Sequence, residues 1–224
     1  MTEKEAILER HSVRAYEDRQ IETEKIQLIE DKIAQLNAAG NLHLQLVRDA
    51  GKTYNKLLTK VAGLGSAPSV IACVGKEADD LDQRVGYYGE QLVLYLQQLG
   101  LNTCWTGTFN RKNIDAVVGA DERLVITIAV GYGKNQGKPH KSKTAEQVID
   151  GSADKPEWFI NGVQMALLAP TAINQQKFMI RLSDDGSVEL IDKGGILSKV
   201  DIGIVRCHFE IGAGSADCPE IKYR

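Results

Sequence analysis

The hydrophobic residues of this chain repeat with two different periods. Apolar positions recur every three or four residues over 23–39 and 79–100, and this spacing predicts two long helices. Gly40 and Gly100 follow the last apolar position of each helix and are typical C-caps. The same reasoning predicts shorter helices over residues 1–9, 57–64, 157–169 and 201–212, and one that begins at residue 110 or 112 and ends at 118.

Predicted strands lie between these helices. Near-continuous apolar runs at 69–74 (SVIACV) and 124–130 (LVITIAV) predict strands that are buried on both faces. Shorter strands are predicted at 42–46, 178–182 and 187–191. Helices between separated buried strands indicate an α/β or α+β protein.

Composition narrows the class of protein. The chain has 224 residues, of which 43% are hydrophobic and 25% charged, and these are ordinary values for a globular protein. A net charge of −3 gives no reason to expect nucleic acid or an anionic membrane as a partner. No apolar run approaches the roughly 20 residues of a membrane span, and the N-terminal segment is too charged for a secretory signal.

Cysteine and histidine positions argue against disulfides and metal. The four cysteines form no C-x-x-C pair and nothing indicates export, so we expect reduced thiols and a cytoplasmic location. The four histidines lie far apart. Cys207 and His208 are adjacent, so on a helix they would diverge by about 100°. We therefore expect no metal site.

One corner between a predicted helix and a predicted strand is rich in hydrogen-bonding groups. The apolar run 158–169 ends at Pro170, which cannot continue a helix, and the residues TAINQQK follow before the strand begins at Phe178. Small residues and amides offer many donors and acceptors with little bulk, as a flat polar ring requires. Taken alone, the segment is better explained as an ordinary helix C-terminus with polar turn residues.

A second polar pattern lies near the N-terminus. Arg10, Ser12 and Arg14 alternate, so in an extended segment their side chains point to one side. Two guanidinium groups beside a hydroxyl match a phosphate, because arginine donates bidentately to phosphate oxygens. The alternative is a solvated basic turn. Similarly, the polar segment 134–155, with lysines concentrated in its first half, is either a basic ligand clamp or a solvated linker.

Two glycine-containing segments could face a ligand. Residues 101–107 (LNTCWTG) leave the long helix with small residues whose backbone N–H groups could reach a ligand. Residues 131–137 (GYGKNQG) follow a buried strand, but their glycine spacing is wrong by one for a dinucleotide fingerprint and no helix follows. We therefore expect no Rossmann nucleotide site.

The chain carries a weak internal repeat. The segment around Asn41 resembles that around Asn174, and the stretch from Val85 resembles that from Lys199, with Gly89 aligned to Gly203. Two related halves about a pseudo-twofold axis would build a cleft between them, although any two helices that end in glycine look alike. No shift in composition divides the chain, so we expect one domain, 1–224, with halves 1–133 and 156–224 joined by the basic loop 134–155.

Together these segments resemble the flavin-dependent nitroreductase family. The R-x-S-x-R at 10–14 is similar to its FMN-phosphate segment, and 98–107 (QLGLNTCWTG) to its passage beside the flavin ring. V-G-Y-G at 130–133 and K-S-K at 141–143 are similar to its closing strand and second phosphate clamp. Residues 169–176 (APTAINQQ) resemble its A-P-S-x-x-N-x-Q motif. The resemblance covers nearly the whole chain and implies an α+β protein with a nitroreductase-like three-layer α/β/α fold and a mixed central sheet.

The place of the last motif indicates a branch of the family. In the usual order it comes soon after R-x-S-x-R, whereas this chain has 37–41 (NAAGN) there and carries the motif late. This resembles the variant branch of thermotogal-type nitroreductases, as does D-I-G-I at 201–204 followed by C-H-F. The ordinary family holds flavin between two subunits. A displaced motif would let one chain furnish both sides, so we expect a pseudo-dimeric monomer or a homodimer.

The resemblance implies an enzyme and a set of site residues. Such an FMN-dependent oxidoreductase takes a hydride from NADH or NADPH and passes electrons to a small nitroaromatic- or quinone-like acceptor, with no protein residue as acid, base or nucleophile. Lys177-Phe178 stands where Pro-Trp is common, which leaves the substrate preference open. The implied cofactor-binding residues are Arg10, His11, Ser12, Arg14, Trp105, Thr106, Gly107, Lys141, Lys143, Pro170, Thr171, Ala172, Asn174 and Gln176.

Two other functions are compatible with the same residues. One is a flavin-binding protein without turnover, such as a sensor or carrier, whose bound flavin NAD(P)H would not reduce at a useful rate. The other is a structural α/β protein whose basic residues are only solvated surface, and which would carry no chromophore. The colour of the purified protein and its response to NAD(P)H separate the three.

Overall fold

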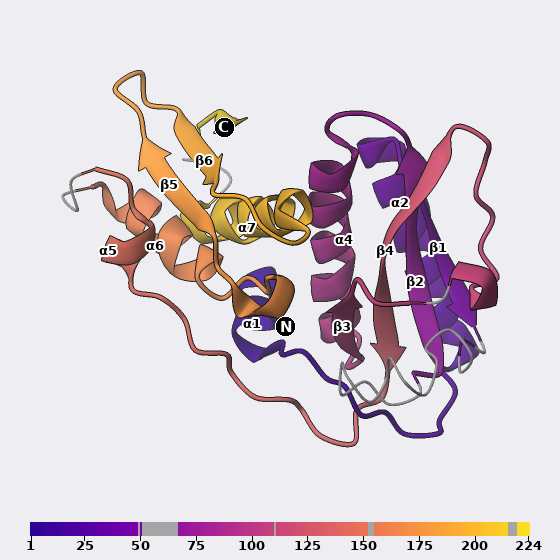
Figure 1. Ribbon diagram of the computed structural model, residues 1–224. Helices are drawn as coiled ribbons and strands as arrows, with labels where there is room; N and C mark the ends of the chain where they lie inside the picture. Colours follow the sequence, from indigo (N-terminus) through magenta and orange to yellow (C-terminus); the bar gives the residue numbers. More distant parts are fainter. Residues whose placement is uncertain (49, 51–66, 110, 152–154, 215–218) are drawn as a thin grey trace. The chain divides into compact units, whose positions relative to one another are not determined.

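Helices and strands of this chain are grouped in two compact units. The computed structural model describes residues 1–48, 50, 67–109, 111–151, 155–214 and 219–224 (Figure 1). The first unit consists of Met1–Leu8, Asp82–Gln91 and His140–Arg224, and the second of Glu9–Leu81 and Leu92–Pro139. The mixture of elements confirms the α+β class. The single domain with halves 1–133 and 156–224 stays a prediction.

A four-stranded antiparallel sheet lies at the centre of the second unit (Figure 1). Its strands, in spatial order, are β1 (His43–Arg48), β2 (Ser69–Lys76), β4 (Glu122–Gly131) and β3 (Asn102–Thr106). The two inner strands, β2 and β4, are buried along almost their whole length. This confirms the prediction from the two apolar runs, because a strand covered on both faces shows no alternation.

Helix α2 (Thr23–Gly40) packs on β1 in this unit. Its buried positions include Ile29, Ile33 and Leu36, which are the helically spaced residues of the sequence pattern. The chain leaves the helix through Asn41, which has a left-handed φ of 47°. Helix α4 (Leu81–Gln98) confirms the second long helix and contributes residues to both units.

Some local predictions differ from the structure. Residues 102–106, expected to lead from a helix into a loop, form strand β3, because they pair in register with the apolar strand β4. The helix predicted over 112–118 is wrong, since only the short 3₁₀ helix η2 (Arg111–Asn113) forms there. The helix predicted over 57–64 lies outside the described residues.

The first unit combines helices with a smaller sheet. Strand β5 (Phe178–Leu182) pairs antiparallel with β6 (Val188–Asp192), and β6 pairs parallel with β7 (Ile221–Tyr223). The resemblance implied a mixed central sheet. Parallel and antiparallel pairing occur together in this three-stranded sheet, whereas the four-stranded sheet is antiparallel. The helices of the unit, besides residues of α4, are α1 (Glu3–Glu9), α5 (Ala145–Val148), α6 (Glu157–Ala166), the 3₁₀ helix η3 (Ala172–Asn174) and α7 (Ser198–Ala213).

Helix α6 packs closely against α7 in the first unit (Figure 1). Phe159 and Phe209, both fully buried, meet edge to face with ring centroids 5.6 Å apart. A side chain at Gly162 would lie 2.6 Å from the Phe209 ring. The glycine therefore makes room for the aromatic pair that holds the two helices together.

Two glycines allow α4 and α7 to cross in close contact within the first unit. A Cβ on Gly86 would lie 2.1 Å from the carbonyl oxygen of Val200, and one on Gly203 would lie 2.1 Å from that of Gln83. The contacts are reciprocal, because each carbonyl belongs to the residue three positions before the other glycine. A local twofold has this form. It pairs Gly203 with Gly86 rather than with Gly89, and duplication of the chain stays a prediction.

Gly203→Ala is expected to lower the free energy of unfolding by about 3 kcal/mol. The added carbon would lie 2.1 Å from the Gln83 carbonyl oxygen and 2.8 Å from the Tyr87 nitrogen, and backbone atoms cannot move without shifting the helix. Chemical denaturation measures the change. Lys199→Ala, an exposed position on the same helix, serves as control and should stay within about 0.5 kcal/mol of wild type. Equal stability of the two variants would contradict the close crossing.

Candidate functional site

The Arg10–Arg14 segment lies along the outer strand of the four-stranded sheet. Ser12 forms a parallel bridge with Thr103, and the Val13 amide donates to the Thr103 carbonyl oxygen at 3.0 Å. Strand β3 stands at the edge of its sheet, so one of its sides is open to this pairing. Two motifs that are far apart in the sequence, R-x-S-x-R and the β3 segment, are thereby neighbours in the second unit.

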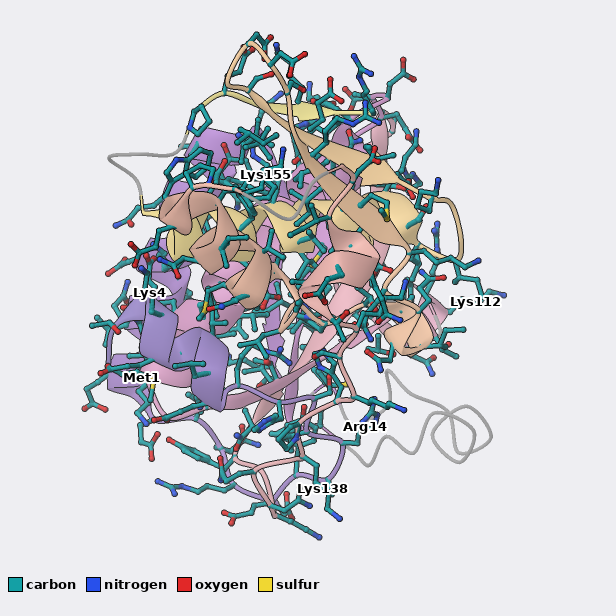
Figure 2. The ribbon with its side chains drawn as sticks, turned by 90° about the vertical axis from the view of Figure 1, so that its left-hand side faces the viewer. Met1, Lys4, Arg14, Lys112, Lys138 and Lys155 are labelled. Carbon is teal, nitrogen blue, oxygen red and sulfur yellow. The ribbon has the colours of Figure 1, made fainter. Side chains whose placement is uncertain are left out.

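Charged and polar groups of this segment gather around Cys104. Burial raises the pKa of the Cys104 thiol, while the charges of Arg14 and Arg10 and a hydrogen bond with Ser12 oppose the rise. Arg10 is only 6% exposed, whereas Arg14 lies at the surface (Figure 2). Both guanidinium groups and the hydroxyl therefore lie near enough to Cys104 to act on its thiol, and their use as a phosphate site stays a prediction.

The segment after β4 supports the same N-terminal stretch. The Glu17 amide donates to the Tyr132 carbonyl oxygen at 2.8 Å, and His11 Nδ1 lies 3.2 Å from the carbonyl oxygen of Gln136. Gly137 has a φ of +73°, and a Cβ there would lie 2.7 Å from that of His11. The glycine-rich segment without dinucleotide spacing therefore packs beside Arg10–Arg14, and His11 is engaged with it.

Trp105 and Thr106 end β3 in the second unit, and Gly107 follows directly after the strand. The Thr106 hydroxyl donates to the Thr108 carbonyl oxygen at 3.3 Å, and the Thr106 carbonyl accepts the Thr127 hydroxyl at 3.2 Å. Trp105 is half-buried and Gly107 is exposed. An exposed glycine therefore comes directly after the strand that pairs with the Arg10–Arg14 segment.

In the first unit, the corner between α6 and β5 has an unusual backbone. Ile173, Asn174 and Gln176 have positive φ angles of 49°, 55° and 45°. Such angles are uncommon outside glycine, and for the β-branched Ile173 they mark a genuine outlier. Its side chain is also 83% exposed. Backbone strain of this kind clusters at functional sites, so the corner is a stronger candidate than its sequence alone indicated.

The amides of the corner bind the loop that carries Lys141 and Lys143. Asn174 Nδ2 and Gln176 Nε2 both donate to the Lys141 carbonyl oxygen, at 3.0 and 2.9 Å. Gln176 Oε1 accepts the Lys143 amide at 2.8 Å, and the Lys143 ammonium donates to the Gln176 carbonyl oxygen at 2.6 Å. Gln176 is 4% exposed, so it positions the basic loop. Its contact with a cofactor stays a prediction.

The start of the corner is tied to helix α7. Pro170 is half-buried, and the Thr171 hydroxyl accepts the Gln176 amide at 3.1 Å, which closes the turn. The Ala172 amide donates to both carboxylate oxygens of Asp201, at 3.0 and 3.1 Å. Burial raises the pKa of Asp201 to about 6, and hydrogen bonds from Gln175 and Ala172 oppose this rise.

Asp201 and Gln175 were missed as site residues by reasoning from the sequence. An aspartate in the first turn of a helix is ordinarily explained by the helix dipole, so it carries no separate functional signal. Gln175 occupies an unspecified position of the A-P-S-x-x-N-x-Q pattern. Only the fold shows that the carboxylate lies against the corner.

A pocket of about 630 Å³ lies elsewhere in the first unit, and no predicted site residue lines it. Its lining residues are Thr2, Glu3, Lys4, Tyr87, Gln91, Cys207, Glu210, Ile211 and Pro219. Burial raises the pKa of the Cys207 thiol well above its ordinary value, so this thiol is not an activated nucleophile. The candidate site residues are therefore still those of the corner from Pro170 to Gln176 in the first unit and those along the edge strand β3 in the second unit.

The described residues show neither a metal-binding cluster nor a membrane-spanning helix. No group of three or more His, Cys, Asp or Glu side chains within them could hold a metal ion. Likewise, none of the helices that the structure describes has both the length and the apolar composition needed to cross a membrane.

Solved structures with a similar fold are nitroreductases. A "putative nitroreductase" of Thermotoga maritima matches with a TM-score of 0.73 and 24% identity, over 100% of this chain and 90% of that one. One of Desulfovibrio desulfuricans in complex with FMN has a TM-score of 0.51, with 18% identity over 70% and 98% of the two chains. A variant of the FMN- and NADPH-dependent nitroreductase of Sphigopyxis sp. strain HMH has a TM-score of 0.52, with 16% identity over 68% and 100%. The fold is therefore the nitroreductase fold.

The family assignment comes from a comparison of the sequence with family models. The model described as "Putative TM nitroreductase" matches residues 3–213, which is nearly the whole chain. The chain belongs to this nitroreductase family, and the resemblance to its thermotogal-type branch is confirmed. No curated protein sequence matches the chain significantly.

Proposed function

We propose that this protein is an FMN-dependent oxidoreductase in which NADH or NADPH is the electron donor and a nitroaromatic- or quinone-like molecule the acceptor. Membership of the nitroreductase family supports a redox function. Structures with the same fold are described as bound to FMN or as FMN- and NADPH-dependent. The observation that carries the proposal is the pairing of Ser12 with Thr103, which gathers Arg10 and Arg14 at the edge of β3.

The chemistry of this donor set fits the phosphate of FMN. A phosphate monoester carries nearly two negative charges and three strong acceptor oxygens. Arg10 and Arg14 offer bidentate donors and Ser12 a single hydroxyl, and each charged hydrogen bond contributes about 1.5–3 kcal/mol. In the first unit, Lys141 and Lys143 add positive charge on a loop that Gln176 holds in place.

The proposal divides the work between cofactor and protein. When bound, FMN supplies the hydride and electron transfer. The protein's part is to bind and orient it. In the second unit the guanidinium groups are suited to a phosphate, and in the first unit the corner from Pro170 to Gln176 is suited to a flat polar ring. Backbone N–H groups near Trp105–Gly107 would stabilise negative charge on the ring. The proposal includes a cytoplasmic location and either a pseudo-dimeric monomer or a homodimer.

The colour of the purified protein tests this function. It is expected to be yellow, to lose its visible flavin absorbance when NADH or NADPH is added without oxygen, and to regain it when a nitroaromatic or quinone follows. Colourless protein that cannot be reconstituted with FMN would contradict the proposal. Bound flavin that neither nicotinamide bleaches would instead identify a flavin-binding protein without turnover.

A further inference from the structure

The strained corner of the first unit requires contacts that hold it in shape. Ile173, Asn174 and Gln176 all have positive φ. Residues of these types adopt other backbone conformations at lower free energy, so this one persists only where contacts with the rest of the protein maintain it. The Lys141–Lys143 loop contacts the corner through Asn174 and Gln176. These two bonds involve neither Ile173 nor Ala172, so the N-terminal part of the corner needs a different contact.

Helix α7 contacts the corner through the Asp201 carboxylate. Asp201, 8% exposed, accepts the Ala172 amide on both oxygens, at 3.0 and 3.1 Å, and the Gln175 side-chain amide at 2.8 Å. Gln175 Nε2 also donates to the Ile196 carbonyl oxygen at 2.8 Å, in the turn before α7. The carboxylate therefore accepts hydrogen bonds from the residue before Ile173 and from the residue after Asn174.

We propose that Asp201 is a positioning residue that holds the corner from Ala172 to Gln175 in the conformation to which the cofactor binds. This inference rests on the proposed function. A carboxylate suits the task, because its two oxygens can accept a backbone N–H and a side-chain amide at the same time. Ile173 is then presented with its apolar side chain exposed, which a flat ring would cover.

Burial of the Asp201 carboxylate costs free energy, so it does not by itself stabilise the folded protein. Loss of solvent raises the pKa of Asp201, and the nearby charge of Asp192 adds to the rise. A buried charge is tolerated where it is hydrogen-bonded, and here the partners are Ala172 and Gln175 of the corner. The hydrogen bonds that the structure shows for this carboxylate are therefore those to the corner.

Three full-length variants test the inference with two measurements. Hydrogen–deuterium exchange of the flavin-free protein reports on the Ala172 amide, and titration with FMN gives the dissociation constant. Asp201→Ala is expected to speed exchange at the corner and to weaken FMN binding about tenfold or more, because bonds to a charged group are lost. Asp201→Asn keeps one oxygen acceptor and should recover most of the affinity. Asp184→Asn, the same charge change in an exposed turn of this unit, should alter neither measurement.

The outcomes separate this inference from the proposed function. Wild-type protein that binds FMN, with an Asp201→Ala variant of equal affinity, would overturn the inference alone. Equal loss in Asp201→Ala and Asp201→Asn, with unchanged exchange, would also overturn it, because the bond to the corner would then not be responsible. Wild-type protein that takes up no FMN would overturn the proposed function and this inference with it.

Discussion

Alanine at both Arg10 and Arg14 is expected to weaken FMN binding by about a hundredfold to ten-thousandfold, or ~3–6 kcal/mol. Each guanidinium would lose a charged hydrogen bond to the phosphate, and such bonds are among the strongest that a protein makes. Titration of flavin-free protein with FMN, followed by the quenching of flavin fluorescence, measures the loss. The residues lie beside Cys104 and away from the central strands, so the sheet itself should persist.

Controls for the double variant distinguish binding from folding. Arg10 is buried and Arg14 is exposed, so Arg14→Ala alone should reduce affinity without lowering the unfolding temperature. Arg19→Ala removes one cation from the same unit, at a residue that pairs with Glu22 and stacks on Tyr132. It should leave FMN affinity unchanged. A folded double variant with wild-type affinity would show that the phosphate is held elsewhere.

Replacement of His208 with alanine is expected to lower the free energy of unfolding by about 3–5 kcal/mol. His208 and Glu90 are both fully buried in the first unit, with Nε2 and Oε1 2.9 Å apart. The other ring nitrogen lies 3.1 Å from the Met165 carbonyl oxygen, so the imidazole links α4 to α6. Without it, the Glu90 carboxyl loses a donor in a place that water does not reach. Chemical denaturation measures the change.

A double-mutant cycle isolates the His208–Glu90 interaction. The variant with alanine at both positions is expected to be more stable than the sum of the two single changes predicts, because neither polar group is then left buried. The exposed pair between Arg123 and Glu77 is the control, and its removal should cost less than about 1 kcal/mol. Additive effects at His208 and Glu90 would contradict a coupled pair.

The elements that could be predicted from the sequence are those whose burial is nearly uniform. Strands β2 and β4 are covered on both faces, so an unbroken apolar run was sufficient to find them. Strand β7 was missed because its three residues are only half-buried and show no pattern. The false helix at 112–118 came from apolar residues such as Val117, which is 70% exposed and whose backbone amide and carbonyl oxygen bond to the Gln45 side chain.

The sequence by itself determined the chemistry of the candidate site. The alternation of Arg10, Ser12 and Arg14 and the motif from Ala169 to Gln176 indicated a nitroreductase only together with the segments 98–107 and 130–143, and the family match confirms that assignment. Each of these motifs lies within a few consecutive residues, so it can be recognised without knowing how the chain folds.

Only the tertiary structure decided which groups meet. It paired Ser12 with Thr103, turned Gln176 towards the Lys141–Lys143 loop and set the Asp201 carboxylate against Ala172. Partners distant in the sequence are selected by packing and by which buried polar groups still need a hydrogen bond, and neither leaves a periodic trace. The left-handed conformation of Ile173 could not be predicted either, because β-branched residues rarely adopt it and its neighbours Ala172 and Asn174 are bonded to two other segments of the chain.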